Sequence, residues 1–271
     1  MQLHLSVPGA ARALWRYRGF IAGNVEREFR LRYTGSVLGV AWNLLQPLAL
    51  VLVYVLVFTE VMRARLPGGG GDAYDYSLYV LAGMLVWLPF SEIIGRCVSL
   101  FIDNANLLKK AAFPRVTLLA SAILSSLVNL GLIALVFALV LVAIGRFPGL
   151  VVLTLLAPIT VMVVLAAGLG ILLGTLNVLF RDVGQFTSIA LQFWFWLTPI
   201  VYPLGVLPER FRVIAARNPL SPLVDAFQSV FLHARAPDWA ALGIVAVMAI
   251  AVFALGYALF KGNAATLVDE L

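Results

Sequence analysis

Long apolar runs, separated by short polar segments, follow one another along almost the whole chain. A helix needs roughly 20 apolar residues to cross a hydrocarbon core of about 30 Å, and the runs are of this length. We therefore predict an all-α membrane protein with six transmembrane helices. The spans are predicted at residues 39–62, 77–100, 116–144, 150–180, 186–202 and 239–260.

A different pattern precedes the first span. Between residues 11 and 33, apolar side chains recur on one helical stripe and arginines lie opposite, which predicts an amphipathic helix on the inner membrane surface. An ordinary cytosolic helix packed on the membrane domain remains open. The stripe consists of Leu14, Tyr17, Ile21, Val25 and Phe29.

Prolines divide the segment 203–238, before the last span, into two short pieces that each have an apolar face. We expect two short re-entrant helices that dip into the outer leaflet. Irregular backbone at membrane depth requires protein or a water-filled cavity around it, so these helices would lie at a pore mouth. A pair of helices lying on the surface is the alternative.

The composition supports a single membrane domain over residues 1–271. With 62% hydrophobic and 12% charged residues and a mean hydropathy of +1.01, the chain has too little polar surface for a soluble globule. We divide it into a cytoplasmic interface helix at 1–38, a membrane region at 39–260 and a cytoplasmic tail at 261–271. The net charge of +6 is typical of membrane orientation and anionic lipid rather than of nucleic acid.

The distribution of cations predicts cytoplasmic N- and C-termini. The termini and the loops on their side hold 11 Lys and Arg, against 7 on the opposite side. Four arginines in the last outer loop weaken this bias.

The chain has few residues suited to catalysis. The single cysteine, Cys97, lies in an apolar run, and His4 and His233 have no neighbouring ligand pattern, so we expect no metal site. The glycine run at 68–71 lacks the Lys and Ser or Thr of a nucleotide-binding loop. We therefore expect no cofactor and no enzyme activity in this chain, and any ATP is hydrolysed elsewhere.

Two helical faces within the spans combine polar side chains with aromatic ones. Unpaired polar groups in hydrocarbon are costly, so these faces indicate a polar path, and amides with flat aromatic walls suit a glycan. Hydrogen bonds between helices and an interfacial aromatic belt are the alternatives. The first seam consists of Asn43, Gln46, Tyr54 and Phe58, and the second of Gln185, Ser188, Gln192, Phe193, Trp196 and Tyr202.

The spans hold almost no acidic residues. The two that they contain, Glu60 and Glu92, lie toward span ends or a kink after Pro89. We expect no carboxylate pair in mid-membrane, which argues against a proton- or sodium-driven carrier.

The inner loop at 103–115 predicts a short helix that presents apolar side chains rimmed by lysines to the cytoplasm. We interpret it as a docking site for a partner, although retention of positive charge on the inside would also explain its cations. The candidate docking residues are Asn104, Asn106, Leu107, Lys109, Lys110, Phe113 and Arg115.

Five strings in order resemble the membrane subunits of ATP-binding-cassette exporters of polysaccharide, in particular exporters of lipid-linked O-antigen. These strings are RLRYTGSVLGVAWNLLQPL at 30–48, DNANLLKKAAFPR at 103–115, NVLFRDVGQ at 177–185, FWFWLTPIVYP at 193–203 and NPLSPL at 218–223. Capsule and teichoic-acid exporters, and less closely lipid or drug exporters, share this plan.

The resemblance implies a homodimer in the bacterial inner membrane, with a channel at the dimer interface and two copies of a separate ATPase that binds ATP and Mg. It implies that the loop at 103–115 is the coupling helix and that the cargo is a glycan on undecaprenyl diphosphate. Arg30, Arg32 and Tyr33, before the first span, are the residues that would guide the lipid head.

Overall fold

The computed structural model describes residues 14–31, 36, 38–61, 74–105 and 115–263, and within them every regular element is a helix. The elements, in chain order, are α2 (Arg18–Leu31), η1 (Gly39–Ala41), α3 (Trp42–Leu56), η2 (Val57–Val61), α4 (Asp75–Asp103), α6 (Arg115–Ala143), η3 (Gly149–Leu155), α7 (Leu156–Leu179), α8 (Asp182–Leu197), η4 (Leu204–Val206), α9 (Glu209–Arg217), α10 (Leu220–His233) and α11 (Trp239–Gly262).

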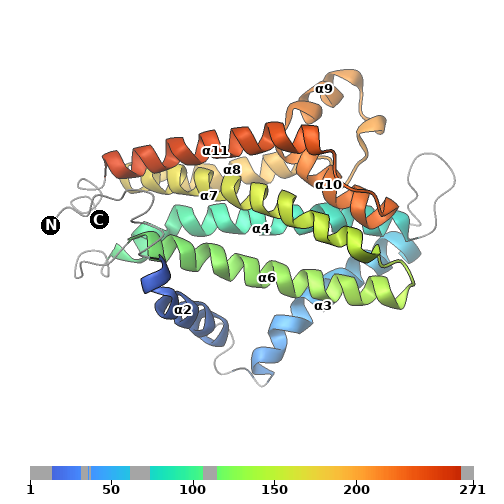
Figure 1. Cartoon of the computed structure of the whole chain (residues 1–271), viewed down its shortest axis with the longest axis horizontal. Helices are drawn as coiled ribbons and strands as arrows, with labels where there is room; N and C mark the ends of the chain where they lie inside the picture. The colour runs from blue at the N-terminus through green and yellow to red at the C-terminus, as the bar shows by residue number, and fades with distance from the viewer. Residues whose placement is uncertain (1–13, 32–35, 37, 62–73, 106–114, 264–271) are drawn as a thin grey trace.

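Four long helices, α4, α6, α7 and α11, run side by side as the body of the protein (Figure 1). In the described part of the chain, these four segments are long and apolar enough to cross a membrane, with α7 extended by η3. Helix α4 is the most deeply buried of them, because α6, α7, α10, α8 and α3 all contact it. The prediction of an all-helical membrane protein is confirmed, and four of the six predicted spans correspond to these helices.

The helices at the first and fifth predicted spans are not among the four candidate spans. Helix α3 has 15 residues and is continued by the five-residue π-helix η2, and α8 has 16 residues. The backbone of α8 leaves the helix at Thr198, just before Pro199. A count of six spans therefore remains a prediction.

Small residues on α7 allow close approach of its neighbours. A Cβ added at Gly174 would lie 2.4 Å from the carbonyl oxygen of Cys97 on α4, and one at Gly168 would lie 2.6 Å from the backbone nitrogen of Phe253 on α11. Such contacts give dispersion energy and backbone proximity, which are the main source of helix association within a bilayer. Helix α7 is thereby fixed between α4 and α11.

The two short helices predicted before the last span are present as α9 and α10. Helix α10 packs its apolar face on α4, whereas α9 projects from the body (Figure 1). Asn218 lies between them, and its side chain accepts a hydrogen bond from the Trp194 indole N–H of α8 and donates one to the hydroxyl of Thr198. A re-entrant position of this pair stays a prediction.

Helix α2 confirms the amphipathic pattern before the first span. Its buried residues are Ile21 and Val25, Arg27 and Arg30 are exposed, and it packs against α6. Its placement among lipid headgroups stays a prediction, as do the domain bounds at 1–38, 39–260 and 261–271.

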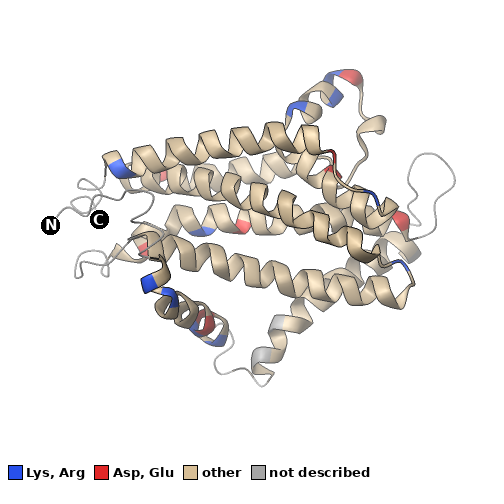
Figure 2. Ribbon diagram, viewed as in Figure 1, with Lys and Arg blue, Asp and Glu red and all other residues tan. Residues whose placement is uncertain are grey.

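Charged residues of the described chain lie mostly toward the ends of the long helices, but α4 also carries charge of both signs in its interior (Figure 2). These residues are Glu92 and Arg96.

Candidate functional site

Two polar side chains lie close to the middle of long apolar helices. Helix α4 runs from residue 75 to residue 103, so Glu92 is three residues past its midpoint at residue 89. Helix α6 runs from 115 to 143, which places Asn129 at its midpoint. With a rise of about 1.5 Å per residue, either helix is about 43 Å long, so both side chains lie well inside helices that are long enough to cross a bilayer.

Glu92 lies three residues after Pro89 within α4, and it does not act alone. The Arg96 guanidinium donates to Glu92 Oε1 from Nε at 2.9 Å and from Nη2 at 2.6 Å. Its Nη1 also donates to Oε1 of Glu28, on α2, at 2.6 Å. Arg96 therefore joins the carboxylate of Glu92 on α4 to that of Glu28 on α2.

Two residues of α6 complete this group. The Ser125 hydroxyl donates to Glu28 Oε2 at 2.7 Å, and the Asn129 amide donates to Glu92 Oε2 at 3.0 Å. We call Glu28, Glu92, Arg96, Ser125 and Asn129 the Arg96 network. It joins α2, α4 and α6 through charge-assisted hydrogen bonds, which are stronger than neutral ones. Its two carboxylates and one guanidinium carry a formal charge of −1.

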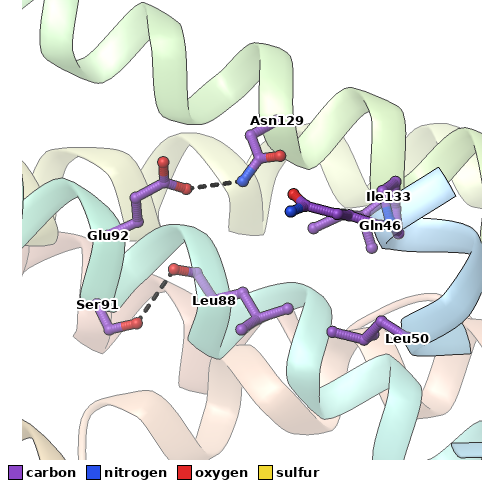
Figure 3. Close-up of a pocket in the computed structure, with 8 residues that line it drawn as sticks. Gln46, Leu50, Leu88, Ser91, Glu92, Asn129 and Ile133 are labelled. Carbon is purple, nitrogen blue, oxygen red and sulfur yellow. Dashed lines mark hydrogen bonds between the residues drawn. The ribbon is translucent and has the colours of Figure 1, made fainter. Parts of the chain in front are cut away.

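A cavity of about 390 Å³ lies beside this network, between α3, α4 and α6, and we call it the midplane cavity. Figure 3 shows Gln46 of α3 extending toward Asn129 and Glu92 from the opposite wall. Leu50, Leu88 and Ile133 supply apolar walls. Its volume lies within the range of about 300–1,000 Å³ found for ligand pockets, and convergent polar groups on apolar walls are typical of such pockets.

A second cavity, of about 560 Å³, lies on the other side of the network, between α2, α4 and α6. Its lining includes Arg27, Glu28, Arg96 and Asp103, so it carries both signs of charge. The Arg96 network thus separates a mixed-charge cavity near the end of α4 from a more apolar cavity at mid-helix.

The residues of the first seam lie in different surroundings. Gln46 lines the midplane cavity, whereas Phe58 lies farther along, with its ring centroid 5.8 Å from that of Tyr54 and 5.1 Å from that of Tyr76. Asn43 belongs to α3, but its side chain is outside the described residues. The polar and aromatic parts of the predicted path therefore occupy different levels.

The second seam lies on the outer face of α8. Its members Gln185, Ser188, Gln192, Phe193 and Trp196 are exposed in the single copy, and the Tyr202 hydroxyl donates to the carbonyl of Trp196. The intervening aromatics face inward: the rings of Trp194 and Phe90 are 5.3 Å apart, and those of Phe195 and Trp87 are 5.4 Å apart. One face of α8 thus packs on the bundle and the predicted seam faces away from it.

Among the described residues, one copy of the chain connects the two seams only at one end, where Phe58 packs on Tyr76 and the Tyr79 hydroxyl donates to the carbonyl of Tyr202 at 3.1 Å. Both α3 and α8 contact α4, but they lie on different sides of it (Figure 1).

The remaining predicted residues lie near the α4 and α2 ends. Asn104 caps α4 and donates from its side chain to the carbonyl of Leu100 at 2.8 Å, and Arg30 pairs with Glu26 on the exposed side of α2. Arg115 begins α6, but its side chain is not described. Outside the described residues lie Arg32, Tyr33, Asn106, Leu107, Lys109, Lys110 and Phe113.

The sequence prediction missed four members of the Arg96 network, namely Glu28, Arg96, Ser125 and Asn129. An Arg four residues after Glu92 in an apolar run, and an Asn at the centre of the next span, are signals that could have found two of them, Arg96 and Asn129. Glu28 had no such signal, because it is 68 residues from its partner. Among the described residues, no group of three His, Cys, Asp or Glu side chains could hold a metal ion.

Comparison with known proteins assigns the family. The ABC-2 type transporter family matches residues 21–232. An O-antigen export system permease protein RfbA of Myxococcus xanthus is 33% identical over 257 residues, covering 93% of this chain and 95% of the relative. The chain belongs to the ABC-2 type transporter family. It is thus a multi-pass membrane permease, and the resemblance drawn from the five strings is confirmed.

Two further relatives are also named as export or transport proteins. An O-antigen export system permease protein RfbA of Klebsiella pneumoniae is 30% identical over 76% of this chain and 78% of its own length. A polysialic acid transport protein KpsM of Escherichia coli is 23% identical over 87% of this chain and 90% of its own length. The Arg96 network and both cavities fall within the family-matched region.

Proposed function

We propose that this chain is the channel-forming permease of an ATP-driven exporter that moves lipid-linked O-antigen polysaccharide out of the cytoplasm. The observation that carries the proposal is similarity along 93% of the chain to a permease named for O-antigen export. Capsule polysaccharide is the second candidate. It has less support, because the polysialic acid transport protein is only 23% identical to this chain. Teichoic acid, lipid and drug cargoes are weaker alternatives.

In this proposal two copies of the chain enclose the channel in the bacterial inner membrane, with their termini in the cytoplasm. The exposed amide and aromatic side chains on α8 support it, because polar groups at this depth are costly against acyl chains and suit a wet interface. The first seam of each copy lines the same path. If Trp196 and Tyr54 are replaced by Ala, we expect less surface glycan; an unchanged amount would reject the glycan path.

Energy comes from two copies of a cytoplasmic ATPase that bind ATP and Mg and dock on the segment from Asn104 to Arg115. ATP-driven closure of these subunits would shift the segment, separate the seams of the two copies and admit the polysaccharide. Hydrolysis would then return the seams to their starting position. The variant Lys109→Glu/Lys110→Glu tests the docking: co-purification of the ATPase should fall while the permease still inserts. An intact complex would reject this site.

Arg30, Arg32 and Tyr33 would guide the undecaprenyl diphosphate head at the entrance. Arg30 suits this role because its ion pair with Glu26 is exposed, and such pairs contribute only about 0–1 kcal/mol, so a phosphate can replace the carboxylate. Replacing both arginines by glutamine should slow export without changing the amount of inserted permease.

Deletion of this chain tests the function as a whole. We expect lipid-linked polysaccharide to accumulate on the cytoplasmic side and surface O-antigen to disappear, with both restored by the wild-type chain. Accumulation of a capsule precursor instead would favour the second candidate, and no change in any lipid-linked glycan would overturn the proposal.

A further inference from the structure

We propose that the midplane cavity between α3, α4 and α6 is a binding site for one uncharged, hydroxyl-rich sugar unit within each copy of the chain. This inference rests on the proposed glycan export. It adds to the two seams a site built by Ser91, Glu92 and Asn129.

The depth of the cavity is the first argument. Glu92 and Asn129 lie close to the midpoints of α4 and α6, and Gln46 reaches toward them from α3 (Figure 3). Polar groups in the interior of membrane-spanning helices face protein or water, because each one exposed to hydrocarbon costs several kcal/mol. A cavity with these walls therefore holds water or a polar ligand in preference to an acyl chain.

The hydrogen-bonding capacity of the walls is the second argument. Glu92 Oε1 accepts two bonds from Arg96, whereas Oε2 accepts one from Asn129, and a carboxylate oxygen offers about two acceptor positions. The Ser91 hydroxyl donates to the carbonyls of Trp87 and Leu88, which leaves its oxygen as an acceptor. These oxygens suit the O–H donors of a sugar.

Charge narrows the ligand class. The Arg96 network carries a formal charge of −1. All three side-chain nitrogens of Arg96 donate to carboxylate oxygens. A phosphate in the cavity would meet the Glu92 carboxylate without a facing cation, so the lipid diphosphate is disfavoured. An uncharged sugar avoids this repulsion, and Leu50, Leu88 and Ile133 can pack against its C–H faces.

Cysteine accessibility tests the site in the intact exporter. The natural chain has one cysteine, Cys97, which is fully buried, so the parent protein is an unreactive background. The reporters are Ser91→Cys and Asn129→Cys, two independent positions in case one fails to fold. The matched control is Val128→Cys, which is the neighbour of Asn129 on α6, is partly exposed in the single copy and does not line the cavity.

The probe is a small, positively charged methanethiosulfonate reagent, applied to permeabilised cells with and without glycan synthesis. We expect both reporters to react in cells without glycan and to react severalfold more slowly in cells that make it, while Val128→Cys does not change between the two. Unreactive reporters would show a dry or lipid-filled cavity and overturn the proposal. Equal rates in both cells would show a wet cavity that no sugar occupies, which also overturns it.

Surface O-antigen, measured in the same cells with the parent chain, separates this outcome from the proposed function. If the parent exports glycan but the reporters are not protected, only the sugar site is wrong. If the parent does not restore export, the proposed function itself is wrong.

Discussion

Arg96 holds two carboxylates from different helices, so replacing it by glutamine should destabilise the permease more than any exposed charge change. The variant leaves Glu28 and Glu92 without their shared counter-charge. The Arg96 side chain is 23% exposed, and those of Glu28 and Glu92 are 35% and 22% exposed, so all three are largely shielded. Removing one partner from a buried ion pair costs about 3–5 kcal/mol, and this partial exposure favours the lower end of that range.

Thermal unfolding in nanodiscs measures this loss. A loss of about 3 kcal/mol should lower the unfolding midpoint by about 6–12 °C, given about 2–4 °C per kcal/mol for chains of this size class. The matched control is Arg30→Gln, because the Arg30–Glu26 pair has the same 2.6 Å separation but side chains that are 74% and 69% exposed. We expect a change of no more than about 0.5 kcal/mol for this control.

A compensating variant tests the physical cause. If the loss arises from uncompensated carboxylates, Arg96→Met combined with Glu28→Gln and Glu92→Gln should recover most of the midpoint, because it removes all three charges together. Equal midpoints for Arg96→Gln and Arg30→Gln would refute the reasoning. A triple variant no more stable than Arg96→Gln would show that packing of the arginine stem, rather than charge, sets the loss.

Two further predictions concern packing and the outer helices. Gly174→Ala should lower the free energy of unfolding by about 1–3 kcal/mol, because its Cβ would lie 2.4 Å from the carbonyl oxygen of Cys97. The control Gly131→Ala, in open space on α6, should be neutral or stabilising. Equal effects of the two variants on the thermal midpoint would contradict the close approach of α4 and α7. Asn218→Ala should lower the free energy of unfolding by about 1–3 kcal/mol, because it leaves the Trp194 indole N–H without its partner. The variant should also shift the tryptophan emission maximum. An unchanged maximum would show that α8 does not depend on this contact.

The long spans were predictable because each carries its own signal. An apolar run near 25 residues permits little besides a membrane helix, and the predicted ranges at 77–100 and 116–144 match α4 and α6 within a few residues. The bounds of α8, at 182–197 against a predicted 186–202, were less predictable. Hydropathy remains high past Thr198, where the backbone leaves the helix before Pro199 and Tyr79 donates to the carbonyl of Pro199 at 3.0 Å.

The candidate site was less predictable than the fold, because its parts come from separate segments. Gln46 was identified from its position in a helical seam, and it does line the midplane cavity. The pairing of Glu28 with Arg96 depends on how α2 packs on the bundle, and a helical pattern in α2 indicates only which face is buried. Helical periodicity defines faces, whereas contacts between distant helices depend on tertiary packing.

ATP-dependent transfer of glycan across a membrane tests the central claim most directly. The purified permease would be reconstituted with its partner ATPase in proteoliposomes that carry a lipid-linked O-antigen on the ATPase side, and protection of the glycan from an added glycosidase would be measured. We predict that protection increases with ATP and Mg when both subunits are present, and stays at background with either subunit alone or with a hydrolysis-deficient ATPase. Equal protection without ATP, or transfer by the ATPase in the absence of this chain, would contradict the account.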